Sequence, residues 1–568
     1  MAHSEISGLS DDDHGSLDEE YIYGRWGRYQ VFQVAIVCFH LLQTGFQLLM
    51  GVFIAYRPPG SRCAVVEFDN LTQMNSSLYV TYESCNIKVF YNDTTAQKLI
   101  KETGCLNGFW YTLDKDSTIV TEMDLVCDRA YLAEVLQSLV FVGQMVGAAF
   151  ASSLSDRFGR KTVHLCSTLL TFIFGISVAF TQNYISLAIL KFILGVLQQG
   201  MVVTGSVLSL ELFPEKTRFY SEGLQALFWT SGLVIMAPIA FLMQNYSWRY
   251  LQITLTSFSA LSLIQFWVQD ESLRWLAVNG KYREAYRVVR KVARWNKLNY
   301  EDLKNIVDRR MARAEKDKCM MEDKKHSEKS KETIIVEKLT IVNIIKNKSI
   351  FIISVMMWFT WVTNSLTYFG LTLTSTSLAG NRFLNFFLSV CVEYIGRILE
   401  FIMLRCLGRR TITLIFHTIT GTALALSTAL NHFSEGSQPA IMTSVVTSFI
   451  GKLSITGSFS LLFLFTAELY PTNLRNAGLG ISSSFSRVGA IVSPFVGLLA
   501  REIPWAPGTI FSSMCFIVVI LSVYLPETRG WDLPQTMAEV KVWYKEKSGF
   551  RLQKGRRRTE ILKVLDIK

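Results

Sequence analysis

Two segments far apart in the chain carry one pattern, Glu-Leu-aromatic-Pro followed four residues later by Arg. They are Glu211-Leu-Phe-Pro-Glu-Lys-Thr-Arg218 and Glu468-Leu-Tyr-Pro-Thr-Asn-Leu-Arg475, and each follows a long apolar run. Their offset is 468 − 211 = 257 residues. A repeat of this length predicts that the chain consists of two halves of similar structure.

Two further motifs recur in the same order. Asp156-Arg-Phe-Gly-Arg-Lys161 and Leu407-Gly-Arg-Arg410 place glycines 249 residues apart (408 − 159). Asp270-Glu271-Ser and Pro526-Glu527-Thr place glutamates 256 residues apart (527 − 271). Parallel repeats are a plan of membrane transporters in which the substrate binds between the halves.

The composition places both halves in a membrane. Of 568 residues, 50% are hydrophobic and 18% are charged, against about 25% charged in soluble domains. Twelve apolar runs are about 18 to 26 residues long, and about 20 residues span a bilayer core. We predict an all-α membrane protein with twelve transmembrane helices in two six-helix halves. Disordered, collagen-like and small disulfide-rich classes are excluded.

The distribution of Lys and Arg predicts the topology. They are in excess in segments 269–348 and 526–568 but not in 56–130, and basic loops stay on the cytoplasmic side. The net charge of +11 therefore reflects topology and not nucleic-acid binding. The predicted order is a cytoplasmic N-terminus (1–30), a first transmembrane helix (31–55), an extracellular loop (56–130), helices 2–6 (131–268), a cytoplasmic helical loop (269–348), helices 7–12 (349–525) and a basic cytoplasmic tail (526–568). Within the cytoplasmic loop, residues 282–295 predict an amphipathic helix lying on the inner leaflet or on the bundle.

The predicted extracellular loop gathers cysteines and glycosylation motifs. An even number of cysteines in an oxidising compartment indicates disulfides. We expect two bridges, with three possible pairings, among Cys63, Cys85, Cys105 and Cys127. We also expect glycans on Asn70, Asn75 and Asn92, each of which begins an Asn-X-Ser/Thr motif.

The motifs carry a family resemblance. The stretch Gly147–Lys161 is similar to the signature between the second and third spans of the major facilitator superfamily. Ser117-Thr-Ile-Val-Thr-Glu-Met-Asp-Leu-Val-Cys127 resembles the segment before the second span of the organic cation, organic anion and carnitine transporters. The resemblance covers nearly the whole chain. It departs at Met123, at Leu273 and in having four loop cysteines where many relatives have six.

The resemblance implies a transporter of small organic ions that works by alternating access in the plasma membrane. The chain has no phosphate-binding loop and no His-Glu-X-X-His motif, so we expect neither an enzyme nor an ATP-driven pump. We expect no cofactor and no metal site, with transport coupled to Na⁺ or H⁺ or to neither ion. The expected partners are the substrate and the lipid bilayer, with no nucleic acid, and the oligomeric state is left open.

A charged cluster at the predicted cytoplasmic helix ends is the candidate gate. Such charges can pair in one conformation and separate in another, although topological anchoring is the alternative. The candidate gating residues are Asp156, Arg157, Arg160, Glu211, Arg218, Glu468 and Arg475.

Ionisable residues inside spans are costly and usually face a partner or an aqueous cavity. Besides His40, they are Lys191, Glu393, Arg397, Glu400, Lys452 and Arg487. Helical spacing allows Arg397 to pair with both neighbouring acids, either as a structural network or with Glu393 free to meet a cation or proton.

Arg487 has no acid within a turn of its own helix. The resemblance implies that this position separates cation transporters, which carry an acid, from anion and carnitine types, which carry Arg. A guanidinium there could bind a carboxylate in a bidentate manner. The alternative is pairing with Glu393 or Glu400 on another helix.

Aromatic and amide side chains complete the predicted pocket. Trp361 and Tyr368 are seven residues apart, so they share a helix face and could bind an organic cation or be core residues. With these, the candidate binding residues are Arg487, Glu393, Lys452, Gln199, Phe228 and Trp229. We favour a carnitine-like zwitterion as substrate. The alternatives are an organic anion exchanger and a receptor or scaffold that does not transport.

Overall fold

The computed structural model describes most of the chain. The described residues are 27–58, 60–64, 78–93, 96–105, 108–213, 218–309, 311–312, 344, 347–433, 437–471 and 474–529. The structural statements below concern these residues. Asn70 and Asn75 lie outside them, as does almost all of the predicted N-terminal segment and basic tail.

The described chain folds into long helices joined by short turns. The first half contains α2 (Arg28–Leu49), α3 (Gly51–Ile54), α6 (Tyr131–Phe158), α7 (Arg160–Val178), α8 (Tyr184–Glu211), α9 (Arg218–Leu242), α10 (Trp248–Leu261) and α11 (Gln265–Val268). The second half contains α16 (Lys348–Thr374), α17 (Arg382–Cys406), α18 (Arg409–Phe433), α19 (Gln438–Leu469), α20 (Arg475–Glu502) and α21 (Ala506–Tyr524).

These helices account for the predicted spans. In the described chain, 11 helical stretches are long and apolar enough to cross a membrane. Helix α17 is not among them, although it has 25 residues. It carries Glu393, Arg397 and Glu400 within its length. One face packs against α9 and α19, and another exposes large apolar side chains, as a helix in contact with lipid does. We therefore assign α17 as the twelfth span.

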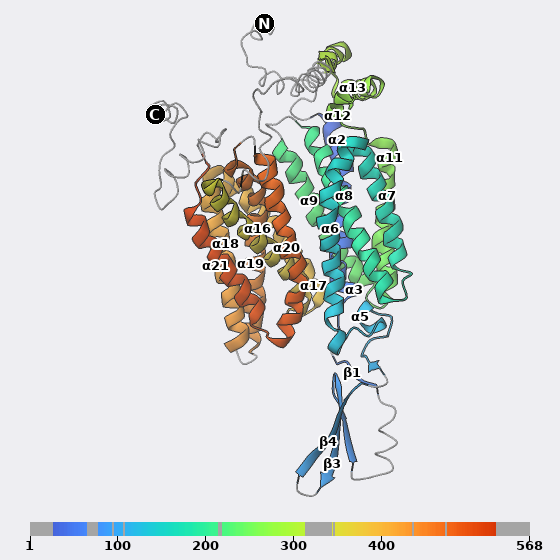
Figure 1. Ribbon diagram of the computed structural model, residues 1–568, viewed down its shortest axis with the longest axis vertical. Helices are drawn as coiled ribbons and strands as arrows, with labels where there is room; N and C mark the ends of the chain where they lie inside the picture. The colour runs from blue at the N-terminus through green and yellow to red at the C-terminus, as the bar shows by residue number, and fades with distance from the viewer. Residues whose placement is uncertain are drawn as a thin grey trace, which may run out of the picture.

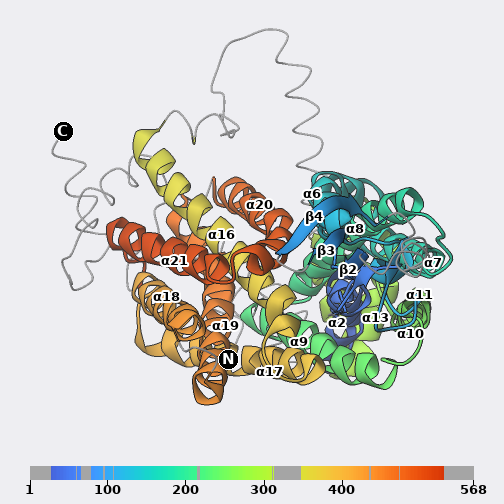
Figure 2. The same ribbon diagram turned by 90° about the horizontal axis from the view of Figure 1, so that it is seen from below.

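The two halves form two bundles that lie side by side (Figure 1). Seen along the bundles, α16 to α21 occupy one side and α2 to α11 the other (Figure 2). Helix α20 packs on α6, and α17 packs on α9, across the boundary. We call the end that carries the strands and cysteines the disulfide end, and the opposite end, which carries α13 (Tyr282–Asn296), the α13 end.

Aromatic side chains join the halves toward the disulfide end. The rings of Phe53 and Phe383 stack with centroids 5.4 Å apart. Phe141 meets the edge of Phe369 at 4.8 Å. Stacked and edge-to-face aromatic pairs stabilise contacts beyond their burial alone. The halves are therefore held together by an apolar seam at this end.

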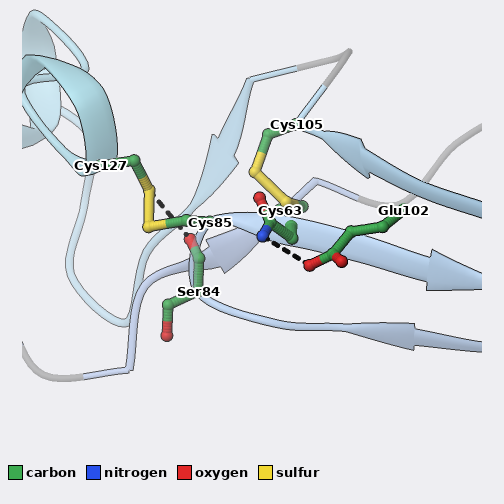
Figure 3. Close-up of a disulfide and its surroundings, with 7 residues drawn as sticks. Cys63, Ser84, Cys85, Glu102, Cys105 and Cys127 are labelled. Carbon is green, nitrogen blue, oxygen red and sulfur yellow. Dashed lines mark hydrogen bonds between the residues drawn. A yellow bond between two sulfur atoms is a disulfide. The ribbon is translucent and has the colours of Figure 1, made fainter.

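The loop at the disulfide end contains β-structure that the sequence did not predict. Strands β2 (Leu78–Tyr82), β3 (Asn86–Asp93) and β4 (Ala96–Gly104) form an antiparallel sheet, and β1 (Arg62–Cys63) pairs with β5 (Phe109–Trp110). The structure pairs Cys63 with Cys105 and Cys85 with Cys127 (Figure 3). This selects one of the three possible pairings. Asn92 lies within β3.

Helix α13 has the predicted amphipathic character and packs on the bundle. Its buried side chains are Ala285, Val288, Val289, Val292 and Ala293. They share an apolar cluster with Tyr29 of α2 and with α12 (Leu273–Val278). Of the two placements that the sequence allowed, the structure shows packing on the bundle.

Candidate functional site

The centre of the second half contains a buried ion pair. The Nζ atom of Lys452 lies 3.1 Å from Glu393 Oε1, and both side chains are at most 1% exposed. The same ammonium donates a hydrogen bond to the carbonyl oxygen of Tyr368 at 3.2 Å and contacts Thr372. A buried charge is tolerated when it is paired and hydrogen-bonded. Glu393 is therefore neutralised by Lys452 and is not a free acid facing a cavity.

The predicted aromatic residues hold this pair in place. Tyr368 donates a hydrogen bond to Glu393 at 3.1 Å, and Trp229 of the first half donates to the Tyr368 hydroxyl at 3.1 Å. The Lys452 ammonium also lies over the Tyr368 ring, 3.5 Å from its centroid. That ring face is therefore occupied by a cation of the protein itself.

Trp361 lies in the core of the second half. Its side chain is fully buried, its indole donates to Thr466 at 3.0 Å, and its ring contacts Phe459 and Phe463. Tyr368 also contacts Phe459, which agrees with the predicted shared face. The core alternative therefore describes Trp361 in this conformation.

Arg487 connects the two halves at mid-depth. Its guanidinium donates to Gln144 of α6 at 2.7 Å and to Gln199 of α8 at 3.0 Å. Both acceptors are neutral amides, and the described residues place no carboxylate within ion-pair distance. The alternative pairing with Glu393 or Glu400 is therefore not formed. A binding role for Arg487 stays a prediction.

Gln144 is a site residue that sequence reasoning missed. It is buried and lies in the middle of α6 between Gly143 and Gly147, where the backbone of α8 approaches closely. Its amide nitrogen donates to Gln198 at 3.3 Å. A glutamine in the middle of an apolar span was the available signal, because a polar side chain at that depth needs a partner.

The helical pairing predicted around Arg397 is wrong in the described structure. No ion pair joins Arg397 to Glu393 or to Glu400 among the described residues. Arg397 instead lies 3.5 Å from the Ser460 hydroxyl. Glu393 pairs with Lys452 on α19 instead, because the packing of the helices places this buried lysine beside it. Residue spacing within one helix could not show this contact.

Phe228 lies away from the ion pair of Glu393 and Lys452. It packs beside the small cluster of Val34, Cys38 and Phe213 in the first half. The structure therefore brings together Trp229, Tyr368, Glu393 and Lys452 around one centre and Gln199 with Arg487 at another. Phe228 and Trp361 occupy separate packing positions.

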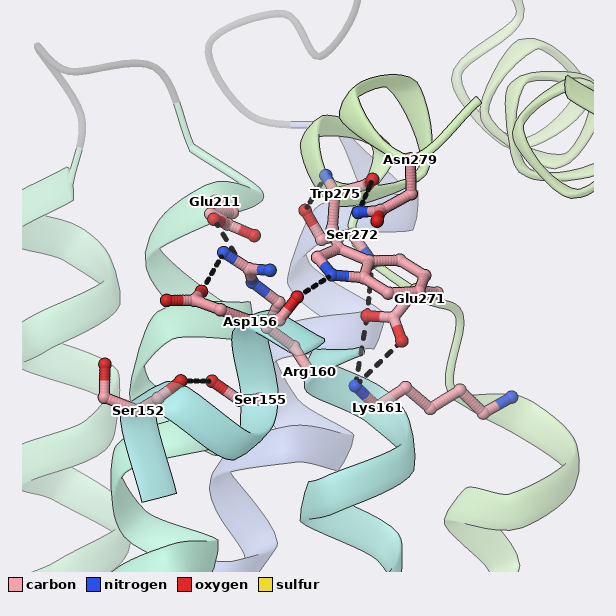
Figure 4. A network of polar contacts seen from close by, with 10 residues as sticks. All are labelled: Ser152, Ser155, Asp156, Arg160, Lys161, Glu211, Glu271, Ser272, Trp275 and Asn279. Carbon is pink, nitrogen blue, oxygen red and sulfur yellow. Dashed lines mark hydrogen bonds and ion pairs between the residues drawn. The ribbon is translucent and has the colours of Figure 1, made fainter. Parts of the chain in front are cut away.

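At the α13 end, the first half carries a polar network (Figure 4). Arg160 pairs with Asp156 at 2.8 Å and with Glu211 at 3.8 Å. Trp275 of α12 donates to the backbone oxygen of Asp156 at 2.9 Å. The network thus connects the turn between α6 and α7 to the end of α8 and to α12.

Glu271 closes this network on the first turn of α7. Both of its carboxylate oxygens accept from the backbone N–H of Lys161, at 3.0 and 3.1 Å. An acid at a helix N-terminus satisfies unpaired N–H groups and the helix dipole. Burial raises the pKa of Glu271, and these backbone hydrogen bonds partly oppose that rise.

The second half repeats the arrangement. Arg409 pairs with Glu468 at 3.1 Å, as Arg160 does with Glu211. Glu527 accepts from the backbone N–H of Thr411 at 3.3 Å, on the first turn of α18. The sequence repeat is therefore also a repeat of contacts.

The other predicted gating residues lie differently. Arg157 is exposed, with its guanidinium 5.3 Å from the Phe158 ring centroid. Arg475 donates to the carbonyl oxygen of Ala467 at 3.0 Å, near the end of α19. The side chain of Arg218 lies outside the described residues. A gating role for the whole set stays a prediction.

The part of the chain that the structure describes contains no group of three or more His, Cys, Asp or Glu side chains that could hold a metal ion. The ionisable residues near the centre, Glu393, Lys452 and Arg487, come from three different helices. Glu393 and Lys452 neutralise each other, whereas Arg487 carries a charge that no described acid pairs with.

Comparison with known proteins identifies the family. The family described as "Sugar (and other) transporter" matches residues 75–538. The organic cation transporter protein of Drosophila melanogaster is 28% identical, over 91% of this chain and 92% of its own length. The human organic cation/carnitine transporter 2 is 29% identical over 91% and 92% of the two chains.

The solved structures agree on the fold. The inward-open xylose transporter XylE of E. coli superposes with a TM-score of 0.57 at 14% identity, covering 90% of this chain and 100% of that one. The matched family and the sequence relatives are transporters and not enzymes, which confirms the prediction that this protein is not an enzyme. The chain belongs to the sugar (and other) transporter family of the major facilitator superfamily, and its sequence relatives are organic cation and carnitine transporters.

Proposed function

We propose that this protein moves small organic ions bearing a carboxylate across the plasma membrane by alternating access, with carnitine-like zwitterions as the first candidates. The proposal rests on the position and the partners of Arg487. It is a charged side chain at mid-depth between the halves, held by Gln144 and Gln199 and by no described acid.

A carboxylate can replace the two amides on this guanidinium. Arginine presents parallel N–H donors that match the two oxygens of a carboxylate, and charge-assisted bonds are stronger than bonds to neutral amides. The exchange would release Gln144 and Gln199 from Arg487, so that binding changes a contact between the halves. A ligand that changes such a contact can bias a two-state transporter.

Neither of the two predicted aromatic residues offers a vacant ring face to the cationic end of a zwitterion in this conformation. Lys452 covers Tyr368, and Trp361 is enclosed. The carnitine proposal therefore rests on the carboxylate end and on similarity to a human relative named for organic cations and carnitine. An organic anion exchanger is the second candidate, because Lys452 neutralises Glu393, whereas Arg487 bonds to neutral amides and pairs with no described acid.

The distribution of contacts supports alternating access. The contacts described between the halves, from Arg487 and Trp229 to Phe53 with Phe383, lie at mid-depth or toward the disulfide end. If the disulfide end is extracellular, contacts between the halves at that end close the outer side. This is the arrangement of an inward-facing transporter. The charge networks at the α13 end each lie within one half.

The placement of the disulfide end outside the cell has its own test. In a eukaryotic host, glycosidase treatment should increase the gel mobility of the protein. Variants Asn70→Gln, Asn75→Gln and Asn92→Gln, alone and combined, should reproduce the shift in steps. Mobility of the wild type that glycosidase leaves unchanged would contradict the topology and with it the direction of transport.

Substrate class is tested by uptake of labelled carnitine, tetraethylammonium and succinate into cells that express matched surface amounts. We expect Arg487→Gln to reduce carboxylate uptake about 30- to 150-fold, the effect of losing about 2–3 kcal/mol of charge-assisted binding. Arg487→Lys should recover part of it, because an ammonium cannot bind both oxygens in a fork. Arg405→Gln, in the last turn of α17, is the matched control.

The outcomes separate the candidates. Carnitine uptake without succinate uptake favours the zwitterion, and the reverse favours the anion exchanger. Tetraethylammonium uptake that persists in Arg487→Gln, without uptake of either carboxylate, would refute the proposal. A wild-type protein at the cell surface that takes up none of the probes would favour a receptor or scaffold.

A further inference from the structure

Two connected cavities lie at the disulfide end, away from Arg487. The outer one has a volume of about 660 Å³ and the inner one about 470 Å³. They share lining residues, including Tyr56, Arg57 and Arg501. Both halves contribute to the walls, since Arg57 follows α3 and Arg501 lies in the last turn of α20.

The outer cavity is basic. Its charged lining residues are Arg57, Arg382 and Arg501, with no acid among the residues that line it. In the inner cavity Glu134 lies 3.8 Å from Arg57 and offsets one of these charges. Burial and the neighbouring Arg501 both lower the pKa of Arg57, and Glu134 opposes this. A cleft lined by one sign of charge attracts ions of the opposite sign.

Lys191 lies deeper, in the wall of the inner cavity. It is 6% exposed, and no hydrogen bond or ion pair joins its ammonium to another described residue. Burying an ammonium without a partner is unfavourable, and a lysine inside a span is usually functional. Lys452 differs in this respect, because that buried lysine has an acid, a carbonyl and a hydroxyl around its ammonium.

The remaining walls of the inner cavity are partly apolar and partly polar. Leu371, Leu373, Leu424 and Phe511 of the second half form the apolar part, and hydroxyl and amide side chains that include Ser427, Thr428 and Asn431 line the rest. Its volume falls within the range of about 300–1,000 Å³ that small-molecule sites occupy. A ligand that fits this lining has a negatively charged head for Lys191 and an apolar body.

We propose that this basic vestibule binds the carboxylate of an amphipathic organic anion at Lys191, as a station separate from Arg487. The ammonium of Lys191 pairs with the carboxylate, the apolar body lies on the leucines and Phe511, and the arginines at the mouth attract the anion. This rests on the proposed function for the direction of travel but not for binding itself. Lys191 and Gln199, a partner of Arg487, are eight residues apart on α8, a rise of about 12 Å.

Equilibrium binding of labelled benzoate to the purified full-length protein tests the site. Benzoate has one carboxylate and an apolar ring, and benzyltrimethylammonium serves as the cationic counterpart. In an Arg487→Gln background, which removes the central site, we expect Lys191→Gln to weaken benzoate binding at least tenfold. Lys191→Arg should retain it. Lys101→Gln, an exposed lysine on β4 at the same end of the molecule, should have no effect.

A second variant covers the case in which Lys191→Gln does not fold. Arg501 has no described hydrogen bond or ion pair, so Arg501→Gln should fold normally. It should weaken benzoate binding about threefold and reduce its dependence on ionic strength. Benzoate affinity and salt dependence equal to the wild type in Arg501→Gln, or affinity unchanged in a folded Lys191→Gln, would overturn the proposal.

Competition distinguishes the chemistry of the ligand. Chloride that displaces benzoate as effectively as unlabelled benzoate does, at constant ionic strength, would show a site for inorganic anions and refute the organic one. Equal binding of benzyltrimethylammonium would also refute it. Because binding is measured without transport, loss of uptake in Arg487→Gln alongside unchanged binding in Lys191→Gln would refute only the vestibule. Loss of binding in Lys191→Gln with no effect of Arg487 on uptake would refute only the central proposal.

Discussion

The two halves are alike at the α13 end and unlike at the centre. At the α13 end, Arg160 with Glu211 and Arg409 with Glu468 are equivalent pairs, and each half places an acid on the first turn of a helix. At mid-depth the charged residues Glu393, Lys452 and Arg487 all belong to the second half. There the first half contributes the neutral side chains of Gln144, Gln199 and Trp229.

This difference distinguishes two roles that polar contacts can have in the protein. A contact that recurs in both halves serves a feature that both halves share, such as the rigid turn at the end of a helix pair. A charge present in one half serves a feature that occurs once, such as an asymmetric substrate. The comparison therefore predicts that equivalent substitutions at the α13 end act alike, whereas central substitutions act differently on stability and on substrate choice.

The largest effect is expected at the central pair. Glu393→Gln leaves the Lys452 ammonium buried without its acid, which should cost about 3–5 kcal/mol of stability. The purified protein should melt at a clearly lower temperature. The double variant Glu393→Gln with Lys452→Met should recover most of the loss, because neither charge then stays buried alone. A single variant as stable as the wild type would show that the pair is not structural.

The next effect concerns the glycine that directly precedes α7. Gly159 has φ +102°, and a Cβ atom there would lie 2.4 Å from Glu271 Oε2. We expect Gly159→Ala to cost about 2–3 kcal/mol through backbone strain and displacement of the acid. Gly280 also has a positive φ, +65°, but its nearest neighbour to a new Cβ is 3.9 Å away. Gly280→Ala should therefore cost only about 1 kcal/mol, and equal melting temperatures for the two variants would contradict the role of Glu271.

The smallest effect tests the equivalence of the two networks. Arg160→Ala removes the pairs with Asp156 and Glu211, and Arg409→Ala removes the pair with Glu468. A partly exposed ion pair is worth at most about 1 kcal/mol, and each variant should reduce uptake about fivefold at unchanged surface amount. Asp156→Asn should act in the same direction. A loss confined to Arg160→Ala would break the equivalence of the halves. Wild-type uptake in all three variants would show that these charges only fix the membrane topology and have no role in gating.

Much of the fold was predictable from the sequence. The spans, the repeat and the amphipathic helix α13 follow from apolar runs, motif offsets and periodicity, which are local properties. The four cysteines that form disulfides were predictable as well. Their pairing was not, because the sequence of one loop is compatible with all three possible pairings. The strands β2 to β4 were missed, although Leu78-Tyr-Val-Thr-Tyr82 and Ile87-Lys-Val-Phe-Tyr91 are rich in the aromatic and β-branched residues that strands favour.

The candidate site divides in the same way. The apolar spans alone show which residues are exceptional, since a charge or an amide inside such a span is conspicuous and costly wherever it lies. Which of these residues meet becomes visible in the packed structure. Arg397 had two acids at helical spacing, yet Glu393 pairs with Lys452 on another helix, and Arg487 reaches Gln144 and Gln199 in the other half. Partners at such depth are set by the packing of whole helices, because a buried charge takes the nearest compensating group in space and not along the chain.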